Sequence, residues 1–101
     1  MLERDIRKAL KERVEAYGGE VRAVAWLGRA HAPDVLCGFT VVSAYAFRDC
    51  RAPRTVWVEA KAPGGKPRPG QLREHRRMRL WGCEVLVIST LEQLDAWLPP
   101  V

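Results

Sequence analysis

Two charged residues, Glu59 and Lys61, place an acid and a base two positions apart. They lie in the segment TVWVEAK, residues 55–61, whose β-branched and aromatic residues predict a strand. Because side chains alternate between the two faces of a strand, Glu59, Lys61 and Trp57 are expected to share one face. This combination is unusual for a plain hydrophobic core and indicates a functional site. The alternative is a surface ion pair between Glu59 and Lys61.

Asp34 supplies a further carboxylate. It follows Pro33 and opens a strand that is predicted over residues 35–46. If this strand and residues 55–61 are antiparallel neighbours, Asp34 and Glu59 lie side by side. Two adjacent carboxylates repel each other unless a cation lies between them. A hard divalent ion such as Mg²⁺ prefers oxygen ligands and retains several waters, so the two acids predict a metal site.

Glu3 is a third acidic candidate, in a helix predicted over residues 2–17. At about 100° per residue, one stripe of this helix is apolar, and Glu3 falls within it. The stripe consists of Ile6, Leu10, Val14 and Tyr17. A carboxylate on a core-facing stripe needs a partner, which a metal site on the sheet beneath would provide. The alternative is that Glu3 only complements the helix dipole in the first turn.

The net charge of +5 and the isoelectric point of about 9.6 indicate a polyanionic partner, nucleic acid or an anionic membrane surface. All of the excess charge lies in residues 66–79, which hold six basic residues and one acid, whereas the remainder holds eleven of each. The six are Lys66, Arg68, Arg73, Arg76, Arg77 and Arg79. A solvated helix face usually mixes both signs, so this stretch favours phosphate binding, to which planar arginine groups are well suited.

Three further residues extend the predicted nucleic-acid surface. Arg22 and Arg29 precede the second strand, and His75 lies four residues after Gln71 on the same face of a helix. His75 is expected to contact DNA near the site, although a single histidine is more often a surface or packing residue.

Cysteine usage and hydropathy restrict the location. The three cysteines, Cys37, Cys50 and Cys83, are odd in number and widely spaced, which excludes a disulfide framework and indicates a reducing compartment. No CxxC or HxxxH pair supports zinc binding with His31 and His75, so buried thiols are expected. No signal peptide or membrane-length apolar run is visible. We therefore expect a cytoplasmic protein, in a bacterium or a phage-infected cell, without a membrane partner.

The predicted order of elements is helix, three strands, helix, strand and a short final helix, in one α/β domain over residues 1–101. Glycines 18 and 19 end the first helix, and Gly82 ends the second. A capping box of Ser89 and Glu92 is expected to begin the last helix. The remaining ranges are strand 20–26, a bulge at Gly38, hairpin 47–54, irregular residues 62–70, a helix from Pro69 or Gly70 to Trp81, strand 83–88, and a helix ending near Leu98.

The motif Pro33-Asp34 followed by Glu59-Ala60-Lys61 resembles the signature of the PD-(D/E)xK nucleases. The surrounding sequence narrows this resemblance to the VRR-NUC family, in its small stand-alone phage and bacterial type. It covers roughly residues 2–98 and includes Glu3, Gly18-Gly19, EAKAPGGKPRPGQLREH and WGCEVLVIST. One residue departs from the pattern: Ala32 stands where the family usually has glycine. If that glycine uses a positive φ, the loop before Asp34 must differ.

The resemblance implies a restriction-endonuclease-like core and a metal-dependent DNA endonuclease that uses Mg²⁺ or Mn²⁺. It assigns Asp34, Glu59 and the backbone carbonyl of Ala60 to the metal, with Glu3 completing the site through water. Lys61 would orient or activate the attacking water, as an electrostatic aid or as a proton carrier. Gln71 would support the water or the substrate.

Two other functions stay open: a non-catalytic module that binds branched DNA or RNA, and a subunit of a larger DNA-processing complex. The joint presence of Asp34, Glu59 and Lys61 favours the enzyme. The resemblance also implies structure selectivity, for four-way junctions or other branched DNA. Symmetric cleavage of a junction needs two active sites, so we expect a homodimer. Four tryptophans are also many for a small domain to bury, and exposed aromatic residues are enriched at interfaces.

Overall fold

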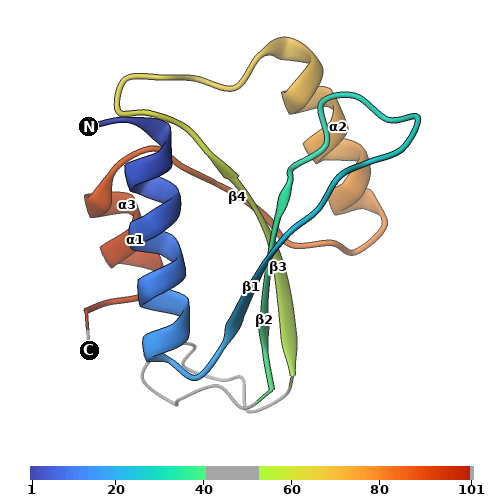
Figure 1. The fold of residues 1–101 in the computed structure, drawn as a ribbon. Helices are drawn as coiled ribbons and strands as arrows, with labels where there is room; N and C mark the ends of the chain where they lie inside the picture. Colours follow the sequence, from blue (N-terminus) through green and yellow to red (C-terminus); the bar gives the residue numbers. More distant parts are fainter. Residues whose placement is uncertain (41–52, 101) are drawn as a thin grey trace.

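The computed structural model describes residues 1–40 and 53–100 and shows a four-stranded mixed sheet with helices on both faces (Figure 1). The elements are α1 (Glu3–Ala16), β1 (Glu20–Ala23), β2 (Val35–Phe39), β3 (Arg54–Ala60), α2 (Pro69–Leu80), β4 (Val85–Ile88) and α3 (Leu91–Trp97). The strands lie in the order β1-β2-β3-β4; β3 and β4 are parallel and the other pairs antiparallel. The predicted α/β class and order of elements are confirmed.

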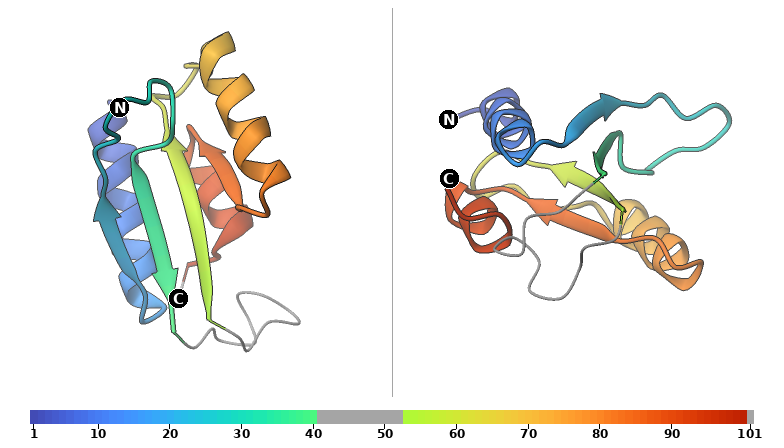
Figure 2. Two further views of the ribbon diagram at one scale, coloured as in Figure 1. Left: turned by 90° about the vertical axis from the view of Figure 1, so that its right-hand side faces the viewer. Right: turned by 90° about the horizontal axis from the view of Figure 1, so that it is seen from below.

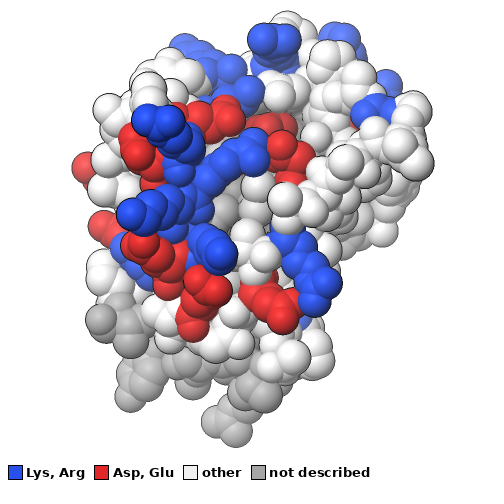
Figure 3. All heavy atoms as spheres, viewed as in Figure 1, with Lys and Arg blue, Asp and Glu red and all other residues white. Residues whose placement is uncertain are grey.

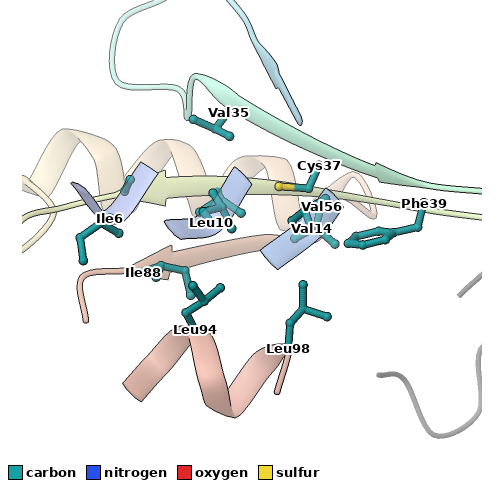
Figure 4. Packing of buried hydrophobic residues seen from close by; sticks show 12 residues of the cluster. Ile6, Leu10, Val14, Val35, Cys37, Phe39, Val56, Ile88, Leu94 and Leu98 are labelled. Atoms are coloured by element: carbon teal, nitrogen blue, oxygen red, sulfur yellow. The ribbon is translucent and has the colours of Figure 1, made fainter. Parts of the chain in front are cut away.

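The main core lies between the sheet and the layer formed by α1 and α3 (Figures 1 and 4). The helices contribute Ile6, Leu10, Val14 and Leu94, with Leu98 just after α3, all fully buried. The sheet contributes alternate residues of its central strands and one residue of β4: Val35, Cys37 and Phe39 from β2, Val56, Val58 and Ala60 from β3, and Ile88. Each fully buried aliphatic side chain stabilises the fold by about 1.5–3 kcal/mol. The opposite parity of β3, which includes Trp57 and Glu59, therefore faces α2.

Helix α2 covers this second face with an unusually polar set of side chains, as the views in Figure 2 show for the helix itself. Its buried residues are Glu74, His75 and Met78, whereas Leu72 and Leu80 are exposed. The sequence left the packing face of this helix undetermined because its apolar residues form no single stripe. In the structure the packing face of α2 is formed largely by polar side chains, and buried polar groups need hydrogen-bond partners.

The first strand is shorter than predicted. β1 ends at Ala23, and although the Val24 N–H still donates to the Asp34 carbonyl at 2.8 Å, the chain then leaves the sheet. Trp26, predicted in this strand, packs in the following loop against Trp57 with ring centroids 5.1 Å apart. Its indole N–H donates to the Pro33 carbonyl, so a side-chain hydrogen bond takes the place of the backbone pairing expected between the two strands here.

The bulge predicted at Gly38 is wrong, because Gly38 pairs in unbroken register with Glu20 and with Thr55. The later part of that predicted strand and most of the hairpin, residues 41–52, lie outside the described residues. Residue 54 of the predicted hairpin belongs to β3, where the Arg54 guanidinium forms an ion pair with Glu84. Strand β4 begins two residues later than predicted.

The capping box predicted for Ser89 and Glu92 is wrong by one position. Thr90 precedes α3, and its hydroxyl accepts a hydrogen bond from the Gln93 N–H. The Gln93 side-chain oxygen accepts from both the N–H and the hydroxyl of Ser89, at 2.7 and 3.1 Å. Both spacings occur in STLEQ, so the sequence alone does not distinguish Ser89 with Glu92 from Thr90 with Gln93.

Helix α1 ends at Ala16, one residue before its predicted end, and the predicted stop at Gly18 follows with a φ of 80°. Cys37 is buried, as expected, and this burial raises the pKa of its thiol to about 12. Cys83 is only partly buried, and Cys50 lies outside the described residues. Among the described residues, no helix has the length and hydrophobicity needed to span a membrane.

Candidate active site

The antiparallel pairing of β2 and β3 brings the two predicted acids together. Val35 lies opposite Val58, so the next position in this register places Asp34 opposite Glu59. The Glu59 side chain is buried, whereas that of Asp34 is 44% exposed. The site therefore has one enclosed carboxylate and one that opens to solvent.

The electrostatic environment of Glu59 is dominated by burial, which raises the pKa of its carboxyl group. The positive charge of Lys61 lowers this pKa, and the negative charges of Asp34 and Glu3 raise it. Arg7 acts in the same direction as Lys61. Glu3, Asp34 and Lys61 thus all lie close enough to Glu59 to influence its carboxyl group.

Arg7 is a site residue that the sequence reasoning missed. Its Nη2 donates to both Asp34 oxygens, at 3.1 and 2.9 Å, and lies 3.4 Å from the Glu3 carboxylate. Burial works to lower the pKa of Arg7, but the hydrogen bond and charge of Asp34 raise it above its usual value. The i,i+4 spacing of Glu3 and Arg7 in α1 was the available signal.

His75 also differs from the expectation. It is fully buried, with Nε2 3.3 Å from the Glu59 Oε1 atom, and so presents no surface to DNA. The predicted DNA contact of His75 is therefore wrong. Burial lowers the pKa of His75, and the charges of Arg79 and Lys61 lower it further, in agreement with a neutral imidazole at neutral pH.

Lys61 directly follows β3, and Gln71 lies within α2. The Lys61 N–H continues the sheet by donating to the Ile88 carbonyl at 2.9 Å, directly after β3. Gln71 lies in the first turn of α2, where its side-chain oxygen accepts from the Arg68 N–H at 2.8 Å. In this arrangement Gln71 stabilises the helix terminus and is not in contact with the acids through a described hydrogen bond.

The donor set of the site fits a hydrated hard cation. In residues 1–40 and 53–100, no three His, Cys, Asp or Glu side chains are arranged to enclose a metal ion. Mg²⁺ rarely needs such a set, because one or two carboxylates, retained waters and substrate phosphates are its usual ligands. Asp34 and Glu59 provide two carboxylates, and the repulsion between their charges is what a divalent cation would relieve.

In the loop before Asp34, Gly28 and His31 have positive φ values of 66° and 70°, whereas Ala32 does not. The His31 ring packs against the start of α2, where a methyl group on Gly70 would lie 2.8 Å from the His31 Cδ2 atom. Ala32 has no positive φ, so its methyl group causes no backbone strain there, and Gly70 permits the close approach of loop and helix.

The predicted basic stretch forms an exposed surface over α2 and the loop before it, seen at the upper right of Figure 3. Lys66, Arg68, Arg73 and Arg76 are exposed. The face of α1 in the same view carries charges of both signs.

The other four arginines that were predicted to contact DNA form ion pairs or hydrogen bonds within the protein. Arg29 and Arg77 each lie 3.2 Å from the buried Glu74 carboxylate, which ties the loop before β2 to α2. Arg79 donates to the Val85 carbonyl, and Arg22 pairs with Glu20 on β1. The stronger candidates for phosphate contacts are therefore the four residues named first, Lys66, Arg68, Arg73 and Arg76.

The fold and the paired acids define a class of small α/β nuclease domains, to which a solved structure described as a VRR_NUC domain belongs. That structure is 37% identical in sequence, covers 93% of this chain and 90% of its own, and superposes with a TM-score of 0.71. A protein named "Putative nuclease p44", from Acyrthosiphon pisum secondary endosymbiont phage 1, is 34% identical over 99 residues, 98% of this chain and 94% of the relative. No family model matches the chain. On these two similarities, the chain belongs to the VRR-NUC family of nucleases.

Proposed function

We propose that this nuclease is a divalent-cation-dependent DNA endonuclease that hydrolyses phosphodiester bonds. The observation that carries the proposal is the pairing of Asp34 with Glu59, next to Lys61, under a basic helix. The paired acids provide hard oxygen ligands, and the basic surface provides phosphate contacts.

The residues divide the work of the site between them. Asp34, Glu59 and the Ala60 carbonyl would hold Mg²⁺ or Mn²⁺, with Glu3 on α1 as an outer acid. When bound, such an ion neutralises phosphate charge and lowers the pKa of a coordinated water. Lys61 stabilises negative charge that develops on the phosphate as the water attacks. Gln71 would orient substrate once its side chain releases the Arg68 N–H and turns to the substrate.

The proposed substrate is branched DNA, with four-way junctions as the main candidate. Phosphate contacts do not read sequence, so binding through a basic surface favours selectivity for DNA shape over DNA sequence. The test compares initial cleavage rates of a four-way junction, a flap and a linear duplex of shared sequence. We expect the junction to be cut fastest, and equal rates on all three would contradict structure selectivity.

The basic surface is expected to control affinity rather than chemistry. Replacing both Arg73 and Arg76 with Ala should weaken DNA binding for all sequences and reduce the slope of log affinity against log salt by about two. The measurement is fluorescence anisotropy over a series of salt concentrations. Arg77 is left unchanged because it also neutralises the buried Glu74.

A matched variant controls for the change in net charge. Lys8 and Lys11 are exposed residues of α1, so the Lys8→Ala, Lys11→Ala variant loses the same two charges from the other helix layer. It should keep a salt dependence close to that of the wild-type protein. Equal losses in the two double variants would show that net charge, and not the α2 surface, determines affinity.

We also propose a homodimer, which would supply the two active sites needed for symmetric cleavage of a junction. Of the four tryptophans, one is the best candidate for the dimer interface. Trp26 and Trp57 pack against each other with their rings tilted by 45°, Trp97 packs edge-to-face on Phe39, and Trp81 is 67% exposed. Trp81 and the neighbouring exposed Leu80 form an apolar corner at the end of α2 that suits a protein contact.

Light scattering at micromolar concentration should give the mass of a dimer for the wild-type protein and of a monomer for Trp81→Glu. The control is Leu27→Glu, which adds the same charge at a residue that is 98% exposed in the loop before β2. A wild-type monomer that stays monomeric on junction DNA would contradict the dimer and favour an enzyme that makes single nicks.

A further inference from the structure

His75 contacts Glu59 from the side of the sheet opposite the main core. The imidazole is fully buried, and its Nε2 atom lies 3.3 Å from the Oε1 atom of Glu59, whose side chain is only 8% exposed. A buried carboxylate without hydrogen-bond donors is strongly destabilising. Because an ionised carboxylate only accepts hydrogen bonds, we assign the ring proton to Nε2, whose N–H then helps to make the burial of the Glu59 carboxylate possible.

The opposite edge of the imidazole is unsatisfied. Within the described residues, the His75 Nδ1 atom is buried and has no hydrogen-bond partner. A residue that only fills space would avoid this cost, because an apolar side chain of similar size leaves no polar atom unpaired. The histidine thus contributes something that an apolar side chain would not, and its contact with Glu59 is what it contributes.

Helix α2 holds the imidazole rigidly. Glu74, the residue before His75, is buried and paired with Arg29 and Arg77, and Met78 is buried one turn further along. These contacts fix the part of α2 from which His75 projects. A donor on a fixed helix restricts the rotation of the carboxylate that it contacts.

We propose that His75 is a positioning residue, whose Nε2–H holds one oxygen of Glu59 so that the carboxylate can bind a divalent cation together with Asp34. This inference rests on the proposed metal-dependent function. Donors that orient a ligating carboxylate typically contribute about 10–100-fold to metal affinity or activity.

The test is Mn²⁺ binding to the full-length chain without DNA, measured by isothermal titration calorimetry. His75→Phe fills a similar volume without an N–H, and should weaken Mn²⁺ affinity about 10-fold or more. His75→Gln places an amide N–H at about the reach of Nε2 and should stay within about threefold of the wild-type affinity. Asp95→Asn removes the ion pair between α3 and Arg13 of α1, which lies outside the proposed site, and should also bind Mn²⁺ normally.

Near-UV circular dichroism and thermal unfolding check that each variant is folded. If His75→Phe does not fold, His75→Asn is used as the loss variant. Its side chain has the same amide group as that of His75→Gln but is too short to reach Glu59. Wild-type affinity in the folded Phe or Asn variant, or equal losses in the Gln and Phe variants, would overturn the role of His75. Absence of Mn²⁺ binding in the wild-type protein would overturn the proposed metal site, and the role of His75 with it.

Discussion

Asp34→Asn and Glu59→Gln are each expected to lower the rate of DNA cleavage by about 10³-fold or more, because ion-assisted stabilisation of a phosphate transition state amounts to several kcal/mol. A carboxamide is a far weaker ligand for a hard cation than a carboxylate. DNA binding should be nearly unchanged, since the proposed phosphate contacts lie on α2 and the loop before it. Single-turnover cleavage and anisotropy on the same DNA separate these two effects.

Asp95→Asn is a closely matched control. Asp95 pairs with Arg13 of α1 at 2.8 Å, much as Asp34 pairs with Arg7 at 2.9 Å, and the two aspartate side chains are 46% and 44% exposed. The control removes an equivalent ion pair from the far side of the core and should keep full activity. Full activity in the Asp34 and Glu59 variants at ordinary Mg²⁺ would show that these acids are not the active site.

Lys61→Met is expected to lower cleavage by about 10²-fold, the typical loss when one group that stabilises transition-state charge is removed. A second effect follows from electrostatics in the metal-free protein. The charge of Lys61 lowers the pKa of Glu59, so its removal must raise that pKa further above the usual value. The Glu59 carboxylate would then become protonated at higher pH than in the wild-type chain.

Carbon-13 NMR titration of the Glu59 carboxyl group in the absence of metal measures this shift directly. Lys61→Arg keeps the charge and should leave the Glu59 titration close to that of the wild-type protein, whether or not cleavage survives. An unchanged titration in Lys61→Met would mean that Lys61 lies too far from Glu59 to act on it.

Most of the fold could be predicted from hydrophobic periodicity and from residues typical of turns. The stripe of α1 and the β-branched runs of β2 and β3 predicted the main core, because apolar burial has a regular spacing in sequence. Element ends were less predictable. β1 ends early because the indole of Trp26 bonds to the Pro33 carbonyl, a tertiary contact that no local pattern records.

The missed features of the site are all buried or half-buried polar pairs. Arg7 with Asp34, His75 with Glu59, and Glu74 with Arg29 join residues that are far apart in the sequence. A polar residue on a helix resembles a solvated one until its partner is known, so α2 seemed to lack a packing face. The acids themselves were recognisable because strand alternation and antiparallel pairing determine which residues become neighbours.

The most direct test of the proposed function is whether DNA cleavage by the purified wild-type chain depends on a divalent cation. Junction, flap and duplex DNA are incubated with EDTA-treated protein, and then with Mg²⁺ or Mn²⁺ added in excess, alongside Glu59→Gln as the inactive reference. We predict no cleavage in EDTA, and cleavage by the wild-type chain alone when either ion is added. Cleavage that persists in EDTA, or binding of DNA without cleavage under every metal condition, would contradict a metal-dependent nuclease.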